Sequence, residues 1–319
     1  MRVLFATDGS EGSAIAAELV GNIRWPIGSS VEVVRVVEDR SLELAAGPWP
    51  AVALRAPDVQ AGVMQEAEDG LETLVEPLRK LGLTTDYAVL RGRPADAILE
   101  RIGQHRPDIV IVGNRGVSPL ERILLGSVSA ELVDGSPVPV LVARKGALER
   151  VVVAVDGSDI AAEALATVRR WPFLAATEIR TLSVAPAPGN GRPGPQEPAR
   201  TIVAAYDGVA VTDAVSEHTA TAADAATSLR AVGFGARSEV LTGAPAATVV
   251  AFAEEWDADL VIMGSHGRTG LTRLLLGSVA RNVLHHAACS VLVIRRHTDP
   301  VRGRQVEAVA RPWTILATH

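Results

Sequence analysis

The chain has 319 residues, of which 48% are apolar, 21% charged and only 3% aromatic, and its formal net charge at pH 7 is −6. These values argue against a nucleic-acid partner, because no basic patch and few base-stacking side chains are present. No apolar stretch reaches the roughly 18 residues that a membrane span needs, and the single cysteine, Cys289, excludes an intrachain disulfide framework. We therefore expect a cytoplasmic protein with no membrane partner.

In chain order, the first half alternates between strand and helix patterns. It predicts a strand over 3–7, a helix over 11–24, a strand over 31–37, a loop over 38–59, a helix over 60–81, a strand over 85–90, a helix over 95–104, a strand over 108–113, a short helix over 127–134 and a strand over 138–144. Alternation of this kind predicts parallel strands joined by right-handed crossovers. Valine-rich strands suit a sheet that is covered on both faces.

The second half repeats the first. FATDGS at 5–10 returns as VAVDGS at 153–158, PDIVIVGNRG at 107–116 as ADLVIMGSHG at 258–267, and VLVAR at 140–144 as VLVIR at 291–295. The repeat predicts an α/β protein with two tandem three-layer α/β/α domains, over 1–146 and 147–297, each with a five-stranded parallel sheet. Residues 298–319 have no counterpart and are expected to form a C-terminal tail.

Each half carries Gly-x2-Gly-x9-Gly-Ser directly after a predicted buried strand, as GNRGVSPLERILLGS at 113–127 and GSHGRTGLTRLLLGS at 264–278. Ligands of such sheets bind beyond the carboxyl ends of the strands. Glycine lets backbone approach a ligand, and a helix that begins at Gly-Ser offers N–H groups to phosphate. The alternative is an ordinary loop with glycine turns and a serine N-cap. Two copies with identical spacing favour the phosphate site.

Asp8 and Asp156 follow the first strand of each half, at the same predicted sheet edge as the glycine loops. A carboxylate there can accept hydrogen bonds from ribose hydroxyls. Alternatively, Asp-Gly-Ser only forms the turn and caps the first helix. The neighbouring glycine loops favour nucleotide contact.

Together, these motifs resemble the universal stress protein family in its tandem form, over the whole chain except the tail. The resemblance implies a Rossmann-like sheet of order 3-2-1-4-5, ATP binding, and packing of the two halves as a pseudo-dimer through their last strands. Two tandem chains are further expected to associate as a homodimer. It implies that Asp8 and Asp156 hold the adenosine and that the backbone of Val37 and Val184 meets the adenine. The residues that it implies for the phosphates are Gly113, Gly116, Gly126, Ser127, Gly264, Gly267, Gly277 and Ser278.

Three functions fit these features. The first is a nucleotide-dependent stress-response module with two ATP per chain and Mg²⁺ carried on each. The second is an ATP-using enzyme, a slow ATPase or nucleotidyl transferase, although the Ser-Gly-Gly-x-Asp-Ser loop of related pyrophosphatases is replaced by DGSEGS at 8–13. The third is a scaffold that binds nothing. No residue set suggests a general base.

Other motifs give less information about function. GNGRPG at 189–194 is flanked by prolines and predicts a loop. His285-His286 is expected at a solvated helix end, because adjacent histidines point to different faces and no further ligands recur at metal spacing. The loop arginines Arg115, Arg122, Arg268 and Arg273 either reach phosphate or form a solvated face.

Overall fold

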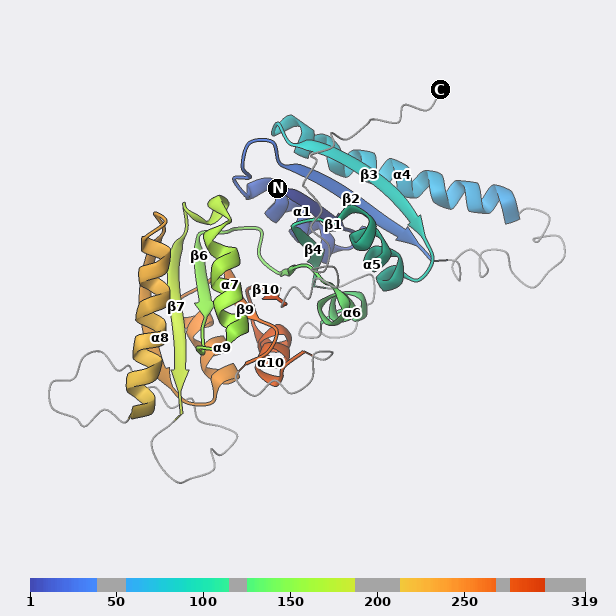
Figure 1. Ribbon diagram of the computed structural model, residues 1–319. Helices are drawn as coiled ribbons and strands as arrows, with labels where there is room; N and C mark the ends of the chain where they lie inside the picture. Colours follow the sequence, from blue (N-terminus) through green and yellow to red (C-terminus); the bar gives the residue numbers. More distant parts are fainter. Residues whose placement is uncertain (39–55, 115–124, 187–212, 268–275, 296–319) are drawn as a thin grey trace, which may run out of the picture.

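Two α/β halves share one continuous sheet (Figure 1). The computed structural model describes residues 1–38, 56–114, 125–186, 213–267 and 276–295. The first half comprises β1 (Arg2–Ala6), α1 (Glu11–Asn22), β2 (Ser30–Val37), α4 (Ala56–Lys80), β3 (Thr84–Arg91), α5 (Pro94–His105), β4 (Ile109–Gly113), α6 (Ser127–Gly135) and β5 (Val140–Ala143).

The second half repeats this order. It comprises β6 (Arg150–Ala154), α7 (Asp159–Arg169), the short 3₁₀ helix η1 (Pro172–Leu174), β7 (Glu178–Ala185), α8 (Asp213–Arg230), β8 (Gly235–Thr242), α9 (Pro245–Glu255), β9 (Leu260–Gly264), α10 (Ser278–His286) and β10 (Ser290–Ile294). None of the described helices is both long and apolar enough to cross a membrane.

The sheet has ten strands in the order β3-β2-β1-β4-β5-β10-β9-β6-β7-β8. Within each half all neighbouring strands are parallel, and each half has the order 3-2-1-4-5 when its own strands are numbered from one. The predicted fold class, with its two tandem domains, is therefore confirmed.

Helices cover both faces of the sheet. In β1, Val3 and Phe5 pack in one core with α1 and α4, whereas Leu4 and Ala6 pack in the other core with α5 and α6. The second half places α7 and α8 on the face of α1, and α9 and α10 on the face of α5. Cys289 is buried, and burial raises the pKa of its thiol to about 11.

The last strands of the two halves pair with each other. β5 and β10 run antiparallel, with Val142 opposite Val291 and Leu141 opposite Leu292, and both strands are buried. An exposed apolar edge strand would pair with other chains, and this contact removes that edge from each half. The predicted packing through the last strands is confirmed. We call the line of contact between β5 and β10 the seam.

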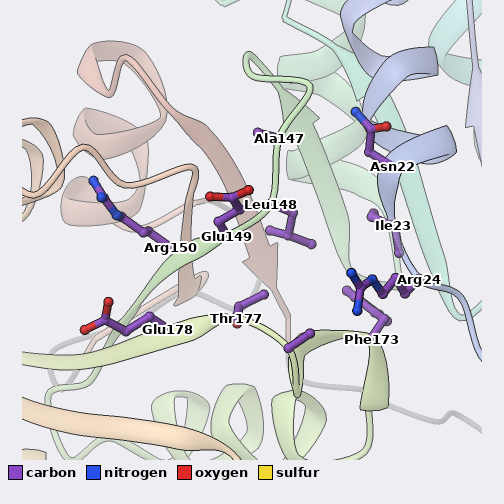
Figure 2. A pocket seen from close by; sticks show the side chains of 11 residues that line it. Asn22, Ile23, Arg24, Ala147, Leu148, Glu149, Arg150, Phe173, Thr177 and Glu178 are labelled. Carbon is purple, nitrogen blue, oxygen red and sulfur yellow. The ribbon is translucent and has the colours of Figure 1, made fainter.

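A cleft of about 490 Å³ lies beside the connection between the halves (Figure 2). Its walls are the end of α1, the connecting residues 147–149 and the starts of β6 and β7. The cleft therefore lies at the amino ends of these parallel strands. Ligands of doubly wound sheets bind at the opposite, carboxyl ends, so this cleft is not where the sequence places its site.

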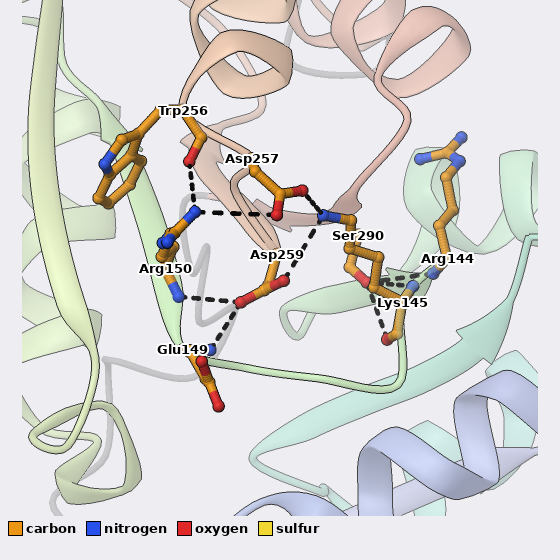
Figure 3. Close-up of polar contacts among 8 residues, drawn as sticks. All are labelled: Arg144, Lys145, Glu149, Arg150, Trp256, Asp257, Asp259 and Ser290. Carbon is orange, nitrogen blue, oxygen red and sulfur yellow. Dashed lines mark hydrogen bonds and ion pairs between the residues drawn. The ribbon is translucent and has the colours of Figure 1, made fainter.

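A polar cluster holds the segment that connects the two halves against the second half (Figure 3). Asp259, with an exposed fraction of 8%, accepts the backbone N–H groups of Glu149 at 2.8 Å and Arg150 at 3.0 Å. Lys145 Nζ lies 2.6 Å from Asp257 Oδ1 and 3.6 Å from Asp259 Oδ1. Partial burial of Lys145 opposes its charge, but these carboxylates outweigh that effect and raise its pKa. The connection is therefore held by a buried carboxylate.

We predict that Asp259→Ala destabilises the protein by about 3 kcal/mol, because two backbone N–H groups and a lysine lose a buried, charged acceptor. The matched control is Asp108→Ala, at the equivalent position of the first half. There the carboxylate accepts a single backbone N–H, from Arg2, at an exposed site, so the loss should be about 1 kcal/mol or less. Urea unfolding of both variants compares them. Equal losses would show that the cluster does not fasten the connection.

Candidate functional site

The turns that follow β1 and β6 hold the two predicted aspartates in the same geometry. Asp8 Oδ1 accepts the N–H of Ser10 at 3.0 Å, and Asp156 Oδ1 accepts that of Ser158 at 2.9 Å. Each serine then caps its helix, because its hydroxyl accepts an N–H from the first turn. The turn-and-cap role is therefore real, and it fixes both carboxylates at the carboxyl edge of the sheet.

Each glycine loop is closed at its base by one backbone hydrogen bond. The N–H of Gly126 donates to the carbonyl of Asn114, and the N–H of Gly277 donates to that of Ser265, both at 2.8 Å. These bonds bring the start of α6 to the end of β4, and the start of α10 to the end of β9. The two ends of each motif are thus neighbours, although they are far apart in sequence.

The serines of the motif do not cap their helices, contrary to the ordinary-loop alternative. Gly126 and Gly277 occupy the N-cap positions, and no side chain accepts a hydrogen bond there. Ser127 and Ser278 are the first helical residues and are exposed. The first N–H groups of a helix lack partners within the helix, so both starts present donors of the kind that bind phosphate.

The first glycine of each loop has a packing role. A Cβ at Gly113 would lie 2.6 Å from the backbone of Gly12, and one at Gly264 would lie 2.5 Å from Ile160 Cγ2. Neither glycine adopts a positive φ. The sequence suggested room for a ligand, but the structure gives another reason, since α1 and α7 press directly on these strand ends.

The second loop touches the aspartate turn. A Cβ at Gly267 would lie 2.8 Å from Asp156 Oδ2, and one at Gly277 would lie 3.0 Å from the carbonyl of Ser265. Asp156, Gly267 and the start of α10 therefore gather at one sheet edge. In the first half Gly116 lies outside the described residues, as do Arg115, Arg122, Arg268 and Arg273 of the two loops.

The strand residue proposed for adenine needs correction in the first half. The carbonyl of Val34 accepts Thr7 N–H from the β1 side, whereas that of Val37 accepts Gly92 N–H on the β3 side. Backbone groups alternate sides along a strand, so Val36, not Val37, directs its N–H and C=O past the end of β1.

In the second half the same reasoning supports Val184. The carbonyl of Leu182 accepts Val155 N–H from the first-strand side, and that of Ala185 accepts Gly243 N–H on the opposite side. Val184 therefore faces the open side. Its structural equivalent is Val36, because Val37 corresponds to Ala185, the last residue of the second strand.

Within the described residues of the loops, two buried polar atoms have no hydrogen-bond partner: Asn114 Oδ1 in the first loop and His266 Nε2 in the second. The His266 ring is oriented by Ser265 Oγ, which lies 3.0 Å from its Nδ1. Leaving such an atom unpaired costs about 1–3 kcal/mol. A polar ligand at the glycine loops would supply the missing partners, so the residues present fit a nucleotide.

The strand order and the paired loops define a tandem doubly wound α/β protein with the closed base of a glycine loop at each carboxyl edge. The model of the universal stress protein family matches residues 1–144 and 147–295. The chain therefore belongs to the universal stress protein family.

Several known proteins are similar to this chain. A universal stress protein of Mycolicibacterium smegmatis is 26% identical over 88% of this chain and 94% of its own length. Universal stress protein MJ0531 of Methanocaldococcus jannaschii is 52% identical over 59 residues, 18% of this chain, and the match spans about a third of that relative's length (35%). A solved universal stress protein from Archaeoglobus fulgidus covers 92% of this chain and 98% of its own, with a TM-score of 0.66 and 22% identity, and it shows the same fold.

We predict that Gly113→Ala destabilises the first half by about 1–3 kcal/mol, because its methyl group must displace the backbone at Gly12. Gly103→Ala is the control: this helical glycine has nothing within 4 Å of its missing Cβ, and alanine should stabilise α5 by up to about 1 kcal/mol. Thermal unfolding measures both changes. Unchanged stability of Gly113→Ala would leave the packing role of this glycine unsupported.

Proposed function

We propose that each half binds one ATP at the carboxyl edge of its sheet, and that the protein acts as a nucleotide-dependent regulatory module in stress responses. The contact of Gly267 with Asp156 is the observation that carries the proposal. It brings a phosphate-type loop and a ribose-type carboxylate together at the point where the strand order reverses, which is the usual ligand position in such sheets.

Each part of the site has a distinct role. Asp8 and Asp156 accept hydrogen bonds from the ribose, and the backbone of Val36 and Val184 pairs with the adenine. The phosphates lie against the glycine loops and the helix starts, where Gly126-Ser127 and Gly277-Ser278 supply N–H donors and hydroxyls.

Mg²⁺ enters with the triphosphate. In the described part of the chain, no group of three or more His, Cys, Asp or Glu side chains is placed to hold a metal ion. The ion would therefore be bound through phosphate oxygens and water, as Mg²⁺ commonly is. Its charge offsets part of the triphosphate charge, which the backbone donors alone do not neutralise.

We predict a stoichiometry of two ATP per chain by calorimetry in the presence of Mg²⁺. Asp8→Ala should remove one site and Asp156→Ala the other, with the remaining affinity changed by less than about threefold, because separate sites are nearly additive. Titration with cAMP tests whether the triphosphate contributes, and released phosphate tests for hydrolysis.

The outcomes separate the three functions. Steady phosphate release would favour the enzyme, and no binding of either nucleotide at millimolar concentration would favour the scaffold. A wild-type stoichiometry of one that Asp8→Ala leaves unchanged would show that only the second half binds.

We also predict that Gly267→Ala, placed in the Asp8→Ala background, weakens the remaining ATP site at least about tenfold. The new methyl group displaces the Asp156 carboxylate rather than straining the backbone, since the φ of Gly267 is not left-handed. Gly103→Ala in the same background is the control and should bind like its parent. Calorimetry gives the affinities, and circular dichroism checks that the fold is intact. An unchanged affinity would refute the assignment of this loop to the ATP site.

A further inference from the structure

The helices that begin at the two glycine loops end against the opposite half. Arg295, directly after β10, donates through Nη1 to the carbonyl of Val133 in the last turn of α6 at 3.2 Å. Arg144, directly after β5, donates to the carbonyl of Leu284 in the last turn of α10. The two contacts are equivalent under the repeat. Cations are favoured at helix C-termini, where carbonyls lack partners. An arginine of each half therefore stabilises the end of the helix that follows the other half's glycine loop.

The next residue of each helix breaks this symmetry. On α6 it is Asp134, whose Oδ1 accepts the N–H of Leu276 at 3.4 Å. Leu276 is buried and directly precedes Gly277-Ser278. A carboxylate of the first half therefore holds the end of the second glycine loop. Arg295 lies close enough for its charge to interact with Asp134 as well.

At the equivalent position of α10 the residue is His285, and the residue equivalent to Leu276 is Leu125. The four residues, Asp134, Leu276, His285 and Leu125, all line one cavity of about 140 Å³ at the seam. Burial lowers the pKa of His285, as do the nearby charges of His286, Arg144 and Arg281, so the ring is mainly neutral at pH 7. His285 is half-buried and faces the seam. The prediction that it lies at a solvated helix end is therefore corrected.

We propose that Asp134 is a positioning residue for the second nucleotide site and makes the two sites unequal. It fixes Leu276, and through it the N–H donors at the start of α10, from across the seam. The first site has no carboxylate at the matching position. This inference rests on the proposed ATP binding, because it assigns to one of the two sites a support that the other lacks.

The test uses single-site backgrounds of the full chain. In Asp8→Ala, where only the second site remains, Asp134→Ala should weaken ATP about tenfold, and Asp134→Asn should recover part of the loss because its amide oxygen still accepts a hydrogen bond. In Asp156→Ala, where only the first site remains, Asp134→Ala should change the affinity less than about twofold. His285→Ala is the matched control and should leave both backgrounds unchanged.

Hydrogen exchange at the Leu276 amide gives a readout that does not need nucleotide. Wild type should protect this amide, and Asp134→Ala should speed its exchange about tenfold or more while β10 amides keep their protection. Equal losses of affinity in both backgrounds, or no loss in either with unchanged exchange, would overturn the role of Asp134. If no background binds ATP but the Leu276 amide responds, the proposed function fails while the contact across the seam stands.

Discussion

The pairing of β5 with β10 determines how the two halves of the molecule are arranged. Because the two strands run antiparallel within one sheet, the parallel strands of the two halves point in opposite directions. Their carboxyl ends, and with them the two aspartate turns, therefore lie at opposite edges of the sheet. The same pairing brings α6 and α10 together at the seam on one face, where Arg144 and Arg295 each reach across to a helix end. One apolar contact thus separates the candidate sites and still joins their supporting helices.

The repeat made the fold predictable. Strand order follows from alternating elements and right-handed crossovers, and the apolar last strands required a partner. Loop closure at Gly126 and Gly277 also agrees with the motif, since both glycines stand immediately before a helix. These features depend on local sequence patterns, and such patterns are visible without coordinates.

Other features depend on contacts that sequence spacing does not encode. The choice between Val36 and Val37 depends on which side of β2 each carbonyl faces, and a one-residue difference reverses that side. Gly113 serves the close approach of α1, which a motif cannot distinguish from room for a ligand. The sequence predicts a solvated helix end for His285 and does not single out Asp134, because nothing in it shows that their helices end at the other half.

Duplication within one chain permits a difference that a symmetric dimer of identical halves forbids. Two identical subunits related by a two-fold axis would place the same residue beside both loops. Here Asp134 and His285 occupy equivalent positions, so one loop end meets a carboxylate and the other a mainly neutral imidazole. Because binding sites respond to the groups that hold their donors in place, the fused chain can give its two candidate sites different affinities while keeping one fold and one pair of motifs.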